Sequence, residues 1–201
     1  MKFTKFLLVA GALVLAIGCA KPPQTDIDAA KAALSAAQTA EAPLYAADAY
    51  AAAKSAVDKM DAEVAAQAKK GALSRKYDAA KTLALTARKA AEDAKTASVT
   101  GKEQLKNQLA QELPALADSI PAAQNMVKNA LKVRGIKLDS KAISAELDAI
   151  KALIADAKTS YDAGKIADAA SKATEAKSRL DAGQKLVQAA IDLAKKPATK
   201  K

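Results

Sequence analysis

Apolar and small residues recur along most of the chain at alternating intervals of three and four, the spacing of one helix face. The clearest rows lie near the C-terminus: Ile143, Leu147, Ile150, Ile154, Ala157 and Tyr161, then Ile166, Ala169, Ala173, Ala176, Leu180, Gly183 and Val187. No segment shows the period-two, β-branched pattern of strands. The pattern predicts an all-α protein.

These two rows predict an antiparallel hairpin that turns near Lys165, because heptad spacing is typical of helices packing at shallow angles. In the predicted register Tyr161 faces Ala169, Ile154 faces Ala176, Leu147 faces Gly183 and Ile143 faces Val187. Large residues mostly oppose small ones, as dense packing requires. A leucine at Gly183 would then force the two helices apart.

A second hairpin of the same kind is predicted in the N-terminal half. Its facing rows are Tyr50, Ala53, Val57, Met60 and Val64, opposite Ala94, Ala91, Ala87, Ala84 and Ala80. The alanine rows of the two halves align at a constant offset, from Tyr77 with Ile166 to Ala87 with Ala176. The alignment fits an internal duplication, and equally the generic similarity of alanine-rich helices.

Start and stop signals divide the first half into three helices. Thr25 can cap a first helix that Pro43 ends. A second helix spans about 44–70 with a C-cap near Gly71, and a third spans about 74–98.

Similar signals predict three more helices in the second half, none longer than about 30 residues. Thr100 opens a fourth, which Pro114 and Pro121 break or kink before Gly135 closes it. Asp139 or Ser140 opens the fifth, which ends at Gly164. The sixth spans about 166–195, before Pro197.

The N-terminus has the form of a lipoprotein export signal. Lys2 and Lys5 precede an apolar stretch, 6–17, that is too short to span a bilayer. It ends in Ala16-Ile17-Gly18-Cys19, which resembles a lipobox, so we expect cleavage between Gly18 and Cys19 and diacylglycerol on the Cys19 thiol. The alternative is an ordinary signal peptide followed by an unrelated cysteine, the only one in the chain.

Two or three acyl chains form a durable membrane anchor. Ala20 follows the cysteine where an aspartate would retain an enteric lipoprotein in the inner membrane, so we expect the periplasmic face of the outer membrane. The predicted organisation is a signal peptide (1–18), a lipidated tether (19–24), an N-terminal helical hairpin region (25–98), proline-kinked connecting helices (99–135), a C-terminal helical hairpin (136–196) and a disordered lysine-rich tail (197–201).

Two resemblances extend this interpretation. Gly164, Ile166, Ala169 and Ala176 have the spacing of the second helix of a tetratricopeptide repeat, although the first-helix tryptophan and closing proline of that repeat are absent. Residues 1–97 resemble a family of alanine-rich bacterial lipoproteins of unknown function in the lipobox, in Ala42-Pro43 and in the Tyr77 to Ala94 pattern. That family implies no activity and no binding residues.

Composition argues against catalysis. The chain has no histidine, its single cysteine is expected to carry lipid, and it lacks a glycine-rich phosphate loop and a GxSxG elbow. We therefore expect no enzyme activity, no metal site and no cofactor other than the lipid on Cys19. Serine and lysine are abundant, but no sequence feature places a serine–lysine pair in a cleft.

Removal of Lys2 and Lys5 with the signal lowers the formal net charge from +10 to +8. Export separates the chain from nucleic acid, so we expect no nucleic-acid partner. Solvated helix faces account for most of the positive charge. Acidic wall polymers and lipid phosphates remain as partners for the rest.

The four tyrosines are the remaining candidates for a binding surface. We expect Tyr50, Tyr77 and Tyr161, which lie on heptad positions, to fill the core. Tyr45, next to Pro43, is the best candidate for an exposed binding aromatic.

Two functions fit these features. The first is a non-catalytic scaffold or protein- and peptide-binding module, anchored in the envelope by lipid. The second is a structural tether, in which Lys201 is joined to peptidoglycan as in short alanine-rich lipoproteins with a C-terminal lysine. Those proteins form one long helix, whereas this chain has at least four predicted breaks.

Overall fold

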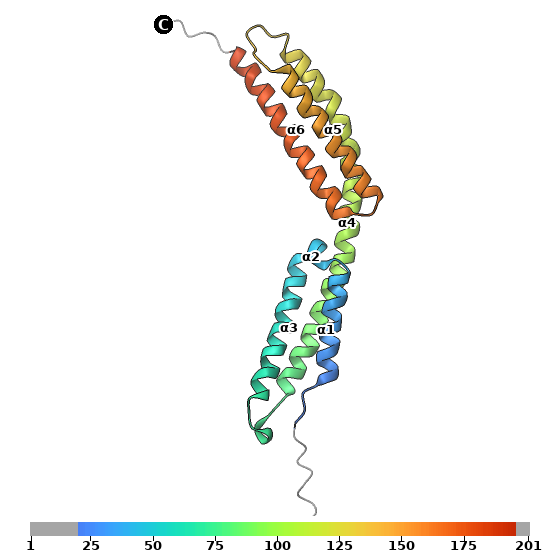
Figure 1. Cartoon of the computed structure of the whole chain (residues 1–201), viewed down its shortest axis with the longest axis vertical. Helices are drawn as coiled ribbons and strands as arrows, with labels where there is room; N and C mark the ends of the chain where they lie inside the picture. The colour runs from blue at the N-terminus through green and yellow to red at the C-terminus, as the bar shows by residue number, and fades with distance from the viewer. Residues whose placement is uncertain (1–19, 196–201) are drawn as a thin grey trace, which may run out of the picture. The chain divides into compact units, whose positions relative to one another are not determined.

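The computed structural model describes residues 20–195, and its regular structure is entirely helical (Figure 1). The six α-helices are α1 (Gln24–Thr39), α2 (Ala42–Tyr45), α3 (Ala47–Ala68), α4 (Asp78–Ala130), α5 (Ser140–Asp162) and α6 (Ile166–Lys195). One 3-10 turn, η1 (Ala72–Ser74), lies between α3 and α4. The predicted all-α class and the helical hairpins are confirmed.

The chain divides into two compact units at Val99 and Thr100, so α4 contributes its first part to one unit and its second part to the other. The first unit contains α1, α2, α3 and the start of α4. The second contains the rest of α4 with α5 and α6. Residues 100–130, which the sequence predicts as part of a connecting segment, belong to the second unit.

Alanine forms the core of the first unit. One cluster brings Ile27 and Ala30 of α1 together with Val57 and Met60 of α3 and with Ala84 and Ala87 of α4. A neighbouring cluster joins Ala37, Ala42, Ala53, Ala91 and Ala94, with Tyr50 packed against it. The predicted packing of this face of α3 against the alanine row of α4 is confirmed. The sequence did not predict that α1 completes the same core, making the unit a three-helix bundle.

A buried hydroxyl joins α1 to α4 at the end of this bundle. Ser98 is fully buried, and its Oγ donates a hydrogen bond of 2.5 Å to the carbonyl oxygen of Ala40. Ala40 is the C-cap of α1, so Ser98 satisfies a carbonyl at the helix end. The next residue, Glu41, turns the chain with φ of 61°.

Several predicted helix ends in the first unit are wrong. The Pro23 carbonyl accepts the first helical bonds of α1, from Asp26 and Ile27, so Thr25 lies inside the helix instead of capping it. The first helix ends at Thr39, and Pro43 lies within α2.

Gly71 is not the C-cap of α3, which is Lys69. The Arg75 guanidinium reaches back over the end of this helix. Its Nη2 donates to the Ala68 carbonyl at 3.1 Å and its Nε to the Lys70 carbonyl at 3.0 Å. The arginine side chain therefore donates to carbonyls at the helix end, a role that backbone amides play where a left-handed glycine caps a helix.

The predicted separation of the third and fourth helices is also wrong. Thr100 lies inside α4, a helix of 53 residues, and neither Pro114 nor Pro121 interrupts it. Both prolines are exposed, whereas the buried residues of this stretch are Leu109, Leu113, Leu116, Ile120 and Ala123. A proline costs a helix its i−4 hydrogen bond, but water can reach the freed carbonyl on an exposed face.

The α5–α6 hairpin is confirmed. Leu147, Ile150, Ile154 and Ala157 are buried on α5, as are Ile166, Ala169, Ala173, Ala176, Leu180 and Val187 on α6. Of the two predicted start residues, Asp139 and Ser140, Asp139 caps α5, and its carboxylate accepts a 3.0 Å hydrogen bond from the Ala142 amide. Gly164, with φ of 75°, ends α5 in a Schellman motif that the amides of Gly164 and Lys165 close on Tyr161 and Ser160.

Gly183 does not pack against α5 as predicted. A Cβ built on this residue would meet no atom within 4 Å. Gly183 lines a cavity with Leu147, so the two residues face the same space without filling it. The expectation that a leucine at this position would force the helices apart is therefore wrong.

The alanine core yields a stability prediction. Ala87 is fully buried between α1 and α3, so Ala87→Leu is expected to lower the free energy of unfolding by about 1–3 kcal/mol through overpacking. Ala97 on the same helix is exposed, and Ala97→Leu is expected to change the free energy of unfolding by less than about 0.5 kcal/mol. Urea denaturation followed by circular dichroism measures both. Equal effects would show that this face of α4 is not packed.

Candidate functional site

The predicted attachment residues fall outside the part of the chain that the structure describes. Gly18 and Cys19 precede residue 20, and Lys201 follows residue 195. Lipidation at Cys19, cleavage after Gly18 and wall linkage through Lys201 therefore stay predictions.

The tyrosines are placed only partly as predicted. Tyr77 is buried, which confirms its packing role, and Tyr50 is half-buried against the alanine cluster of the first unit. Tyr45, the predicted exposed aromatic, is half-buried at the last position of α2. Tyr161 is also half-buried, and it lines a groove that the sequence did not predict.

This groove, with a volume of about 700 Å³, runs between α4 and α5 in the second unit. We call it the α4–α5 groove; its lining residues are Leu109, Ala110, Leu113, Pro114, Ala117, Asp118, Ile120, Pro121, Gln124, Lys151, Ile154, Ala155, Lys158 and Tyr161. Most of them are apolar. Its size and lining fall within the range of ligand-binding sites in proteins.

The two prolines of α4 both lie along this groove. They are seven residues apart, close to two helical turns, so both occupy the same face. Because proline has no N–H, the carbonyls of Ala110 and Ala117, four residues earlier, lose their usual helical donors. Both alanines line the groove as well. Two residues of the apolar wall therefore carry carbonyls that lack the i+4 donor of a regular helix.

Lysines lie on the α5 side of the groove. Lys151 pairs with Asp148 at 3.0 Å and Lys158 with Asp162 at 3.0 Å, both within α5. All four side chains are at least 45% exposed, so these pairs are weak and can exchange for carboxylates of a ligand. Pro114 and Pro121 stand out in the sequence, but there they predict breaks in the helix and not a groove.

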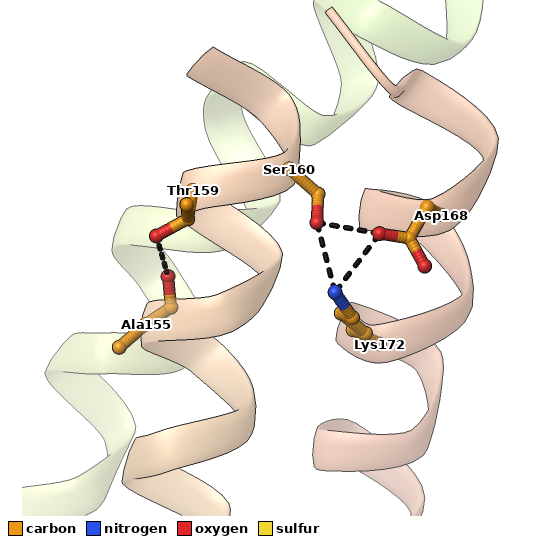
Figure 2. A network of polar contacts seen from close by, with 5 residues as sticks. All are labelled: Ala155, Thr159, Ser160, Asp168 and Lys172. Atoms are coloured by element: carbon orange, nitrogen blue, oxygen red, sulfur yellow. Dashed lines mark hydrogen bonds and ion pairs between the residues drawn. The ribbon is translucent and has the colours of Figure 1, made fainter. Parts of the chain in front are cut away.

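A second polar arrangement brings a serine and a lysine together near the α5–α6 turn (Figure 2). The Ser160 hydroxyl donates to Asp168 Oδ2 at 2.6 Å. The Lys172 ammonium donates to Ser160 Oγ and to Asp168 Oδ2, each at 2.9 Å. Ser160 comes from α5, and the other two come from α6.

The directions of these bonds suit a structural link. An active nucleophilic serine would give its proton to a neutral base. Here the Ser160 proton points to a carboxylate, and Lys172 acts as a donor to both partners. None of the three residues lines the α4–α5 groove. The Ser160 bond to Asp168 and the Lys172 ammonium lower the pKa of Asp168, which keeps the carboxylate charged.

A bidentate ion pair joins the same two helices farther from the turn. Arg179 Nε and Nη2 donate to Glu146 Oε1 and Oε2, each at 2.7 Å. This pairing lowers the pKa of Glu146. Lys177 of α6 also approaches Glu112 of α4 at 3.4 Å. Side chains thus fix the register of an otherwise alanine-rich interface.

Within residues 20–195, no cluster of three or more acidic, cysteine or histidine residues could hold a metal ion. Over the same range, no helix combines the length and hydropathy needed to cross a membrane. No protein-family model, curated protein or solved structure matches this chain significantly. Its function is therefore inferred from the sites themselves.

The two lowered carboxyl pKa values predict acid sensitivity. A group whose pKa is lower in the folded state stabilises that state above its unfolded pKa, and the contribution is lost as the pH falls through the folded pKa. The free energy of unfolding is therefore expected to fall below about pH 4, as Glu146 and Asp168 are protonated.

Urea titrations at neutral and acidic pH measure this dependence. Glu146→Gln should reduce the dependence of the free energy of unfolding on pH, because glutamine does not titrate. Asp156→Asn is a matched control, since Asp156 is an exposed carboxylate on the same helix. An equal effect of both substitutions would contradict the role assigned to the Arg179–Glu146 pair.

Proposed function

We propose that this protein is a non-catalytic lipoprotein, anchored through Cys19 at the periplasmic face of the outer membrane, that binds a protein or peptide partner. The observation that carries this proposal is the α4–α5 groove. The lipobox in the sequence supports the anchor. The absence of histidine supports a binding role over a catalytic one.

The groove favours an amphipathic helix as the bound segment. A third helix laid on α4 and α5 would place apolar side chains at i, i+3 or i+4, and i+7 against Leu113, Ile120 and Ile154. Acidic residues on the flank of such a helix would meet Lys151 and Lys158. The partner is therefore expected to carry a helix with one apolar stripe and a flanking row of carboxylates.

In this mechanism the lipid anchor lowers the affinity that the groove needs for its partner. A lipid anchor confines the module to a surface and raises its effective concentration toward other envelope proteins. A groove of moderate affinity is then sufficient for recruitment. The half-buried Tyr161 lines the groove and can serve as an aromatic anchor for the partner.

Site-specific photocrosslinking in cells tests this proposal. A benzophenone amino acid at Ala117, inside the groove, is expected to give a discrete adduct, whereas the same probe at Gln111, exposed on α4 outside the groove, is not. Lys151→Glu with Lys158→Glu should reduce the adduct, since both would repel an acidic helix.

Anchoring is verified in the same strain by palmitate incorporation, which Cys19→Ser should abolish. Equal labelling from the two probe positions would overturn the groove as the binding surface. Palmitate incorporation that persists in the Cys19→Ser variant would overturn the anchor.

The tether to peptidoglycan through Lys201 remains the alternative. One sequence argument against it was that no helix exceeds about 30 residues, and the 53-residue α4 removes that argument. Purified sacculi digested with lysozyme distinguish the two functions. Protein that is recovered with the wall, and lost when Lys201 is deleted, would favour the tether.

A further inference from the structure

A second cavity, of about 410 Å³, lies in the second unit between the end of α4, the start of α5 and residues 180–187 of α6. We call it the end cavity. Its apolar lining residues are Ala123, Met126, Val127, Leu138, Ala142, Ile143, Leu147, Ile150, Leu180, Gly183, Leu186 and Val187, and its polar ones are Lys137, Asp139, Glu146 and Gln184. It shares no lining residue with the α4–α5 groove.

The walls of this cavity come from three helices and the connecting segment between α4 and α5. Gly183 borders open space in this cavity, because a Cβ added there would meet no atom within 4 Å. Leu186 at its edge is 71% exposed. The volume suits an extended hydrocarbon chain but not a helix, whose diameter with side chains is about 10 Å.

The chain segment 128–141, of which residues 137–139 line the cavity, is positively charged, because it holds five basic side chains and one acidic side chain. Both acidic residues in the lining are engaged: Asp139 accepts from the Ala142 amide, and Glu146 is held by Arg179. Lys137 makes no ion pair with any residue in the range 20–195. Further basic residues on the same stretch of chain are Lys128, Lys132, Arg134 and Lys141. An apolar chain with an anionic head complements this arrangement.

We propose that the end cavity binds one single-chain anionic amphiphile of the fatty-acid class. The acyl chain lies among Ile143, Leu147 and Val187, and the carboxylate meets the Lys137 ammonium at the mouth. This site is independent of the peptide groove and of lipidation at Cys19.

Equilibrium binding of saturated fatty acids to residues 20–201, produced without lipid and kept below micelle-forming concentrations, tests the proposal. Affinity is expected to rise about fourfold with each added methylene until the cavity is full. The methyl ester of the same acid should bind about tenfold more weakly, because it carries no charge.

Two pairs of variants locate the ligand. Lys137→Ala is expected to weaken palmitate binding about tenfold, whereas Lys132→Ala, on the same segment but outside the lining, should have a smaller effect. Gly183→Phe should fill the cavity and abolish binding. Ala189→Phe, at an exposed position of α6, should leave binding unchanged.

Circular dichroism confirms that each variant folds, and Gly183→Leu provides a smaller obstruction if phenylalanine prevents folding. Undiminished palmitate binding to the folded Gly183 variant would overturn the proposal. So would an affinity that does not depend on chain length. Binding to phosphatidylglycerol vesicles without binding to monomeric palmitate would also overturn it, since it would assign the basic segment to a membrane surface.

Discussion

The close approach of alanine-lined helices is the contact on which the first unit depends. Seven alanines of α1, α3 and α4 in its two core clusters are fully buried, with Val57 and Met60 as the larger side chains among them. A buried alanine removes little apolar area from water, so each position contributes a modest stabilisation. Many such positions are needed, and every one tolerates only a small side chain.

This constraint explains what could be predicted from the sequence. A tightly packed helix face needs small residues, and these recur in the sequence at intervals of three and four. The core positions of Ala84, packed with Met60, and of Ala176, at the α5–α6 interface, could therefore be predicted. The α5–α6 hairpin was equally clear, because Gly164 marks its turn and Asp139 marks its start.

Several other helix ends and both cavities could not be predicted in the same way. Thr100, Pro114 and Pro121 carry local signals for ends or breaks, but the buried row of α4 continues past them and decides the outcome. The prolines are exposed, so the carbonyls that lose their helical hydrogen bonds to them can bond to water instead. The two cavities, and the link from Ser160 to Asp168 and Lys172, depend on how helices meet, which no local pattern records.

The Schellman turn at Gly164 also bears on the order in which the second unit assembles. It joins α5 and α6 through three residues, so their contacts close a very short loop and carry little entropic cost. Contacts with α4 span a longer stretch of chain and form at greater cost. Pairing of α5 with α6 is therefore expected to cost less loop-closure entropy than docking of α4, whereas the α4–α5 groove exists only once α4 has docked. A ligand that binds this groove would therefore stabilise the fully assembled unit, including the contacts between α4 and α5.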